Sequence, residues 1–525
     1  MKKKVLSICV ASALACNLYA DGGADNSEVM AQLEALKAQI AALEAKLADN
    51  SKEIEKVDQK LTRTNKNVSD VKVAALNDNI KWDVDFRTAF DNIQYKHASG
   101  AKSKNPDLLT NRLWLGMGYA PDDNNLFKGK LSYYKAYGDT ANHSQSNVNP
   151  GYADFDWVTN ENALDGNIRV KEAYWLYQND TFFDANTPWT ISIGRRPSTD
   201  GLGINTREGM NDNSPLAHTV NVEFDGMSAR FDLDKITGVD GMWWKLCTGR
   251  GLTNATPRFD MFSPDYSYDG NNNKDINMYG FIFVPWDNGQ YSVRTNWARG
   301  ENVIGFNDAD INGFNAAYSA YYYGIGNNST GVAATAKGVQ EFVDLVHATP
   351  RFATVGDIDL ATVMLRADGI GDGINDFLDE TVAFASWAQS KTRPKGSMLG
   401  SPDSKTGHST WIGVDMPLLL TEDGRWGIEW NKGSKYWRSM TYAEDTMAGS
   451  KIAARGTAWE IYYNQPLTKA LHLNARYTQI KYDYTGSNGF FGDDGAPMAI
   501  ADALAKGQDP VEKARDLRLS ISYKF

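Results

Sequence analysis

The chain has 525 residues and a formal net charge of −11, with 15 Trp, 25 Tyr, 46 Gly and a mean hydropathy of −0.47. This acidic balance argues against a nucleic-acid partner, because phosphate binding requires a basic surface. Many aromatic residues and glycines with a hydrophilic average are typical of a water-filled membrane barrel, whose strands face lipid on one side and water on the other. A secreted sugar-binding β-protein would have the same averages, so composition leaves both classes open.

Residues 1–20 predict a secretory signal peptide. Three lysines precede an apolar run over 5–14, and a small residue closes the segment. The run is shorter than the about 20 residues that a transmembrane helix needs. Lipidation at Cys16 is the alternative, although the residues before it match a lipoprotein site only loosely. Cleavage leaves Cys247 as the single cysteine, so no intramolecular disulfide is expected.

Residues 21–79 predict an α-helical coiled coil. Apolar residues recur at alternating steps of four and three between Val29 and Val71. An amphipathic helix packed on its own domain is the alternative, but a stripe of two residues per heptad is narrow for a globular face. Only one such segment is present, so a homo-oligomer is expected, and Asn50 within a mixed Leu and Ile seam favours a trimer. The expected core includes Leu33, Leu36, Ile40, Leu43, Leu47 and Ile54.

From residue 80 onward the hydrophobic period changes to 2. Trp82, Val84 and Phe86 share one face of the first segment, and charged residues share the other. Segments of about 9–11 residues repeat this pattern to the end of the chain. Short connections alternate with long polar ones such as 139–166 and 197–220. Residues 80–525 therefore predict an all-β, antiparallel transmembrane β-barrel of about 16 or 18 strands.

The final segment, DLRLSISYKF, alternates strictly and ends on an aromatic residue. It resembles the terminal strand of Gram-negative outer-membrane proteins, in which Tyr523 and Phe525 would belong to the signal read by the barrel-assembly machinery. The signal peptide, the heptad repeats and the segment GRRPSTDGLGINTREGM extend this resemblance. The chain resembles a poorly characterised group of outer-membrane porin-like proteins that carry a periplasmic coiled coil. The resemblance implies the outer membrane as location, with contacts to its lipid and lipopolysaccharide. Peptidoglycan is a further candidate partner of the coiled coil.

The interior of such a barrel is expected to hold water, because about 16–18 strands enclose more space than side chains fill. An inward-folded loop would narrow it, and fixed charges would set solute preference. The alternative is that any lumen wall is polar and that most of these charges matter little individually. The pore-lining or constriction candidates are Arg87, Arg112, Arg169, Lys171, Arg195, Arg196 and Arg207.

Within this set, Arg195 and Arg196 followed by a glycine-rich loop with Arg207 are the best constriction candidates. Arg195 is included although it shares the parity of the apolar Ile191 and Ile193. The acids expected to oppose these arginines are Asp200, Glu208 and Asp212.

Other chemistry is weakly indicated. Asp308, Asp310 and Asn312 have the spacing of a calcium loop, but Ser319 stands where a bidentate Glu is needed, so no metal is expected. The histidines lack ligand spacing and no nucleophile motif is present, so we expect no cofactor and no enzymatic activity.

The sequence thus predicts an outer-membrane porin, a channel for passive diffusion of small hydrophilic solutes or ions. The alternative is a structural or receptor barrel, which would tether the envelope through the coiled coil or bind a ligand through long loops.

Overall fold

The structure is a computed structural model that describes residues 80–137, 168–210, 215–252, 275–306, 352–371, 373–421, 423–441, 444–487 and 496–525, with five isolated positions. The expected signal peptide, the coiled-coil core and the candidate calcium ligands Asp308, Asp310 and Asn312 lie outside the described residues. Two compact units divide the chain at residue 75, and the second unit, Leu76–Phe525, contains the strands.

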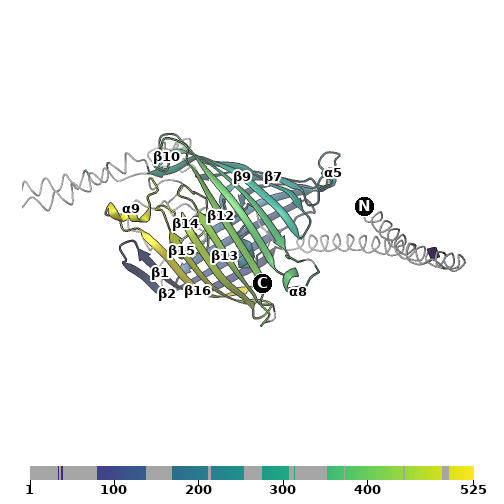
Figure 1. Cartoon of the computed structure of the whole chain (residues 1–525). Coiled ribbons are helices and arrows are strands. Elements are labelled where there is room, and N and C mark those ends of the chain that lie inside the picture. Colours follow the sequence, from purple (N-terminus) through teal and green to yellow (C-terminus); the bar gives the residue numbers. More distant parts are fainter. Residues whose placement is uncertain are drawn as a thin grey trace, which may run out of the picture. The chain divides into compact units, whose positions relative to one another are not determined.

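Sixteen antiparallel strands form one closed barrel, the smaller of the two expected strand numbers (Figure 1). Each strand pairs with its neighbours in sequence, and the first pairs with the last. Closure matters physically, because an open sheet edge would leave unpaired N–H and C=O groups in a bilayer. The strands are β1 (Lys81–His97), β2 (Lys102–Tyr119), β3 (Asn125–Ala136), β4 (Arg169–Asn179), β5 (Trp189–Arg196), β6 (Phe224–Asp232), β7 (Trp243–Leu252), β8 (Ile276–Asp287), β9 (Tyr291–Phe306), β10 (Phe352–Asp368), β11 (Val382–Pro394), β12 (Thr406–Pro417), β13 (Arg425–Gly433), β14 (Gly456–Pro466), β15 (Leu471–Tyr482) and β16 (Val511–Lys524).

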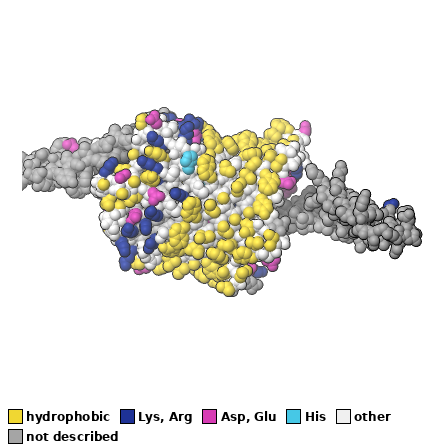
Figure 2. Space-filling view, viewed as in Figure 1, with side chains coloured by type: hydrophobic (Ala, Val, Ile, Leu, Met, Phe, Trp, Pro, Cys, Tyr) yellow, Lys and Arg dark blue, Asp and Glu magenta, His cyan; other side chains and the backbone are white. Residues whose placement is uncertain are grey.

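Side chains alternate between the two faces of the barrel wall. In β16, Leu517, Leu519 and Ile521 are exposed outside, while Arg518 and Ser520 are buried inside. The same alternation in the other strands produces the broad apolar outer surface that Figure 2 shows. In strands such as β16, a period of 2 therefore separates an apolar outer face from a polar inner face.

The two ends of the barrel differ. The end where β1 begins and β16 finishes, here called the terminal end, has connections such as 120–124, 288–290 and 467–470. The opposite end, here called the loop end, has the longer connections. The described helices are short, and none has the length and apolar character needed to cross a bilayer. They are α4 (Ile204–Glu208), α5 (Asp234–Thr237), α8 (Asp376–Asp379) and α9 (Ile500–Ala505).

Among the described residues, two long loop-end connections fold into the barrel, whereas the sequence predicted one inward-folded loop. Inner loop A, residues 197–223, joins β5 to β6 and contains α4, and inner loop B, residues 434–455, joins β13 to β14. Val220 and Val222 of inner loop A and Met440 of inner loop B are buried in a cluster with inward-facing residues of β8, β9 and β10. The interior is thus partly an apolar core, and the expected water-filled lumen with one constricting loop needs correction.

Candidate functional site in the barrel interior

Four arginines on four neighbouring strands face the interior: Arg476 of β15, Arg518 of β16, Arg87 of β1 and Arg112 of β2. Arg87 lies directly opposite Arg112, and Arg476 lies directly opposite Arg518. All four side chains are buried. Like charges opposite one another destabilise a sheet, so this arginine row requires acidic partners. The wall itself supplies two of them from β1, Asp91 at 2.6 Å from Arg518 and Asp85 at 3.4 Å from Arg112.

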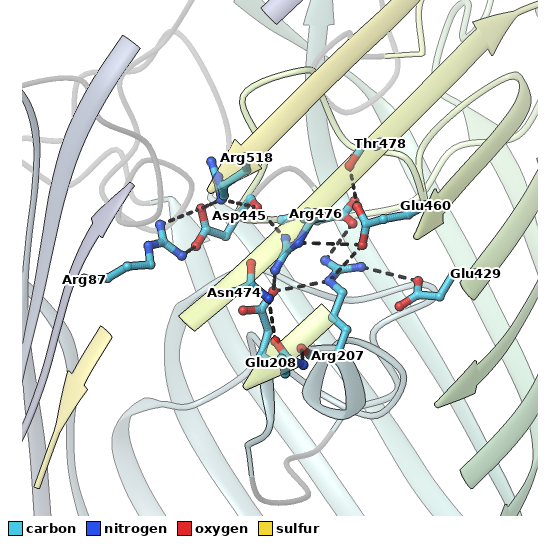
Figure 3. A network of polar contacts seen from close by, with 12 residues as sticks. Arg87, Arg207, Glu208, Glu429, Asp445, Glu460, Asn474, Arg476, Thr478 and Arg518 are labelled. Carbon is cyan, nitrogen blue, oxygen red and sulfur yellow. Dashed lines mark hydrogen bonds and ion pairs between the residues drawn. The ribbon is translucent and has the colours of Figure 1, made fainter. Parts of the chain in front are cut away.

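Asp445 of inner loop B is the principal partner of the arginine row (Figure 3). Its carboxylate accepts hydrogen bonds from Arg87, from Arg112 at 2.9 Å and from Arg518 at 3.1 Å. Tyr134 also lies within hydrogen-bond distance, at 3.4 Å. Burial alone would raise the pKa of Asp445, but the three guanidinium charges outweigh it and hold that pKa well below its usual range. Asp445 is therefore an anion at any physiological pH.

The local backbone of inner loop A places a second carboxylate near the row. Gly203, with φ 101, precedes α4, and Gly209, with φ 60, ends it in the left-handed conformation that favours glycine. The amide of Gly209 donates to the carbonyls of Asn205 and Thr206, which closes the single turn. This turn presents its last two side chains, Arg207 and Glu208, to the opposite wall.

Glu208 binds Arg476 of the arginine row and also lies 3.3 Å from Arg207 (Figure 3). Burial alone would raise the pKa of Glu208, but Arg476 and Arg207 outweigh it and lower the pKa from 4.5 to about 2. Both inner loops thus contribute a carboxylate to the same row of arginines.

Arg207 is the centre of an acidic group on the other side of α4. It donates to Glu444 of inner loop B at 2.9 Å and to Glu429 of β13 at 3.4 Å, and lies 3.6 Å from Glu460 of β14. Lys451 of inner loop B binds Glu429 at 2.6 Å and Glu460 at 2.8 Å. Alternating positive and negative groups therefore extend from the wall through both inner loops, which balances charges that would be costly if buried alone.

A second ion-pair site holds inner loop A where the loop leaves the wall and where it rejoins the wall. Lys171 of β4 donates to Glu223 at 2.8 Å and to Thr199 at 2.7 Å, and lies 3.7 Å from Asp200. Its ammonium also lies 4.9 Å from the centroid of the Trp114 ring. Lys171 thus fixes both the beginning and the end of inner loop A to the wall.

Neutral contacts fix the middle of the same loop. His218 is fully buried, and its ring nitrogens lie 2.8 Å from the hydroxyl of Ser386 and 2.9 Å from that of Ser409. Desolvation lowers the pKa of His218 to about 3, so the ring is neutral. The rings of Trp411 and Trp437 pack against it, with their ring centroids 5.6 and 5.7 Å from the centroid of the His218 ring. Inner loop A is consequently a docked element.

A cavity of about 300 Å³ lies between inner loop A and the wall formed by β6 to β9. Its strand residues lie toward the terminal end, where Arg230, Lys245 and Arg294 contribute positive charge and Asp287 negative charge. Leu202 and Leu216 of inner loop A cover it on the side of the loop. The arrangement can bind small polar or ionic solutes, but within the described residues no cluster of metal ligands is found.

The structure brings some predicted residues together and separates others. Arg87, Arg112 and Arg207 belong to one network, and Lys171 belongs to the second site. Arg196 faces the interior, where its guanidinium lies 4.5 Å from the centroid of the Tyr174 ring. Arg169 is the first residue of β4, at the loop end.

Arg195 needs correction as a pore-lining candidate. It lies on the outer face, opposite Ala173 and Asp225, and its guanidinium is 3.6 Å from the Asp225 carboxylate. The side chain at Asp225 is 70% exposed, whereas that of Arg195 itself is 9% exposed. Strict alternation in β5 explains this placement, because Arg195 shares a face with Ile193.

The predicted acids also differ in their positions. Glu208 lies 3.3 Å from Arg207, one of the arginines that it was expected to oppose, and also binds Arg476 of the arginine row, which was not expected. Asp200 lies beside Lys171, and Asp212 is outside the described residues. Sequence reasoning missed Asp445 and all of inner loop B. The inward parity of Glu429 and Glu460 was readable from β13 and β14, but their common partner, Arg207, was not.

A closed antiparallel barrel of sixteen strands, with few helices, an apolar outer surface and a charged interior, defines a porin-like transmembrane β-barrel protein. Within that class, the chain belongs to the family described as "Protein of unknown function (DUF3373)", whose model matches residues 102–525.

Comparison with solved structures finds porins at low sequence identity and with TM-scores below 0.5. An anion-selective porin from Comamonas acidovorans has a TM-score of 0.43 at 11% identity, covering 85% of this chain and 99% of that one. OprB from Pseudomonas putida has a TM-score of 0.45 at 11% identity, covering 87% and 96%. Salmonella typhi OmpF, in complex with daunomycin, has a TM-score of 0.42 at 12% identity, covering 86% and 99%. No curated protein matches the sequence.

Proposed function

We propose that this protein is a narrow outer-membrane channel for passive diffusion of small hydrophilic solutes and ions. The observation that carries the proposal is the arginine row of β15, β16, β1 and β2 facing Asp445 and Glu208 of the two inner loops. Fixed charges inside a closed barrel create a local field, which sorts solutes by charge. A non-enzymatic role, a homotrimer and a periplasmic coiled coil over 21–79 belong to the same proposal.

The path proposed for solutes begins at the terminal end. The cavity of about 300 Å³ there is large enough for several water molecules and ends at inner loop A. Trp437 and Arg455 of inner loop B are fully buried, so this loop fills another part of the interior. We therefore expect a small single-channel conductance and a strict size limit, rather than the wide opening of an unobstructed barrel of this size.

Planar-bilayer recording tests the proposal. Purified protein should give small discrete current steps, and replacing residues 434–455 by a short glycine-containing turn between β13 and β14 should enlarge them. The control is a variant with an insertion in the exposed turn at 467–470, which changes the chain length by the same number of residues as the loop replacement does. Absence of steps from both the natural protein and the loop variant, with folding confirmed by β-type circular dichroism, would exclude a channel.

The structural or receptor barrel remains the second candidate, because the buried apolar cluster of both inner loops is more extensive than conduction requires. In that case the natural protein should give no steps while the variant without inner loop B conducts. Deletion of residues 26–79 distinguishes a tether from a channel. If the protein is a channel, the variant keeps conducting, whereas if it is a tether, cells that carry the variant lose envelope integrity. Outer-membrane lipid, lipopolysaccharide, the assembly machinery and peptidoglycan are the partners proposed for either role.

A further inference from the structure

A row of four lysines crosses the outer face of β2, β1, β16 and β15 near the loop end. Lys102 lies directly opposite Lys96, Lys96 opposite Lys513, and Lys513 opposite Lys481. Neighbouring strands are about 4.8 Å apart, so the row spans roughly 14 Å. Strand alternation turns these side chains outward, because Ala514 next to Lys513 is buried inside.

A second outer row lies two residues closer to the terminal end. It places Lys104 opposite Gln94, and Gln94 opposite Arg515 of β16. The Arg515 guanidinium donates to Gln479 at 3.0 Å. Figure 2 shows Lys and Arg side chains gathered at this side of the barrel, next to the apolar outer surface. Together the two rows form a basic surface that consists of Lys96, Lys102, Lys104, Lys481, Lys513 and Arg515.

Few carboxylates balance this basic surface. Glu512 binds Lys96 at 2.5 Å and also interacts electrostatically with Lys513 and Lys481, and Asp483 lies 3.7 Å from Lys481. Among the described residues, Lys102, Lys104 and Lys513 take part in no ion pair. Like charges directly opposite one another across paired strands repel. The side chains of Lys96 and Lys481 are 43% and 55% exposed, so an external anion can reach them.

Apolar residues continue from the basic surface along the same strand. After Arg515, the outward positions of β16 are Leu517, Leu519 and Ile521, which are 42%, 46% and 41% exposed. Alternate residues are about 7 Å apart, so a ligand bound at Arg515 could lay hydrocarbon directly on Leu517. The combination fits an amphiphile with a phosphate headgroup and acyl chains.

We propose that the basic surface binds the phosphate groups of a phosphorylated glycolipid of the lipid A type, with acyl chains along β16. Basic residues beside an apolar membrane surface attract anionic lipid headgroups. A row of about 14 Å exceeds what one phosphate occupies and suits a headgroup with two phosphates. The site rests on the proposed outer-membrane location, but it is on the outer face and does not depend on conduction through the interior.

Binding to the full-length protein in neutral detergent tests the proposal by native mass spectrometry. The probes are bisphosphorylated lipid A, dephosphorylated lipid A, phosphatidylglycerol and inorganic pyrophosphate. The test variant is K96Q/K102Q/K481Q/K513Q. The matched control, K81Q/K128Q/K235Q/K469Q, removes four exposed lysines away from this surface. A milder variant, K102Q/K104Q, keeps the test valid if the quadruple variant does not fold.

The bisphosphorylated lipid should bind most tightly, and the test variant should weaken it about tenfold or more while the control does not. K102Q/K104Q should weaken it severalfold. Equal binding of the dephosphorylated lipid, or unchanged binding by both test variants, would overturn the proposal. Phosphatidylglycerol binding as tightly would overturn the glycolipid assignment, and full competition by pyrophosphate would identify a site for free phosphate instead.

Discussion

Val220 of inner loop A and Met440 of inner loop B form a parallel β-bridge inside the barrel. The Met440 amide donates to the carbonyl of Thr219 at 2.8 Å, and the Asn221 amide donates to the carbonyl of Met440 at 2.6 Å. Both side chains belong to one buried apolar cluster. The inner loops therefore support each other as well as contacting the wall, and each should depend on the other for its position.

Cysteines at this bridge should cross-link the two loops. Directly paired residues in adjacent strands have Cα atoms within the range that a disulfide spans. With Cys247 replaced by Ser, V220C/M440C should oxidise to one internal disulfide, detected by mass spectrometry, with single variants as controls. Cross-linked protein should keep the conductance of the reduced form. A pair that stays reduced under oxidising conditions would show that the loops separate in the membrane.

Removal of the Asp445 charge should destabilise the barrel interior. D445N leaves the guanidiniums of Arg87, Arg112 and Arg518 without their shared anion, and breaking a buried ion pair costs about 3–5 kcal/mol. The free energy of unfolding, measured by urea titration in micelles, should fall accordingly, and any current should shift toward anions. D184N, which changes an exposed turn, is the control. Equal stability of the two variants would contradict the central role of Asp445.

Acid should loosen inner loop A only at low pH. Because the folded-state pKa of Glu208 is lowered from 4.5 to about 2, its ionised form stabilises the protein fully above about pH 4.5. That contribution, about 3 kcal/mol at most, is lost as pH falls through about 2. The free energy of unfolding should therefore decrease as the pH falls from 7 to 2, and this decrease should be smaller in E208Q. Loss of stability already at pH 6 would require another titrating group.

Inner loop A should tolerate a methyl group at one glycine and not at another. A Cβ at Gly203 would lie 2.3 Å from the Trp411 ring, with φ at 101, whereas one at Gly209, with φ at 60, would meet nothing within 4 Å. G209A should cost about 1–2 kcal/mol, the penalty of the left-handed conformation. G203A should cost clearly more and change Trp fluorescence. Equal unfolding free energies would show that Trp411 moves aside freely.

The strand pattern of this barrel could be predicted from the sequence because side-chain alternation is a local property. Arg87 and Arg112 share the parity of polar positions, and both lie inside. Arg195 shares the parity of Ile193, and the structure places it outside. Arg195 was the one candidate whose parity conflicted with a pore-lining role, and its predicted role was the one that needed correction.

The sequence of β8 indicates that something apolar fills the barrel interior. An alternation of apolar and polar residues with a period of 2 does not by itself reveal this. In β8, Met278 and Ile282 face inward, while Phe281 and Phe283 face outward, so the strand is apolar on both faces. Apolar residues on both faces indicate burial on both faces. In a membrane barrel, that pattern requires something apolar on the inside as well as lipid outside.

The sequence by itself determined the class of the fold, an antiparallel β-barrel of about 16 or 18 strands, and the face that most strand residues occupy, since both follow from a repeat of two along the chain. Only the tertiary structure decided which loops enter the interior and which acids meet the arginine row. Asp445 and Arg87 are distant in sequence and touch only because the barrel closes around inner loop B. Contacts of that kind depend on three-dimensional packing, which no local period records.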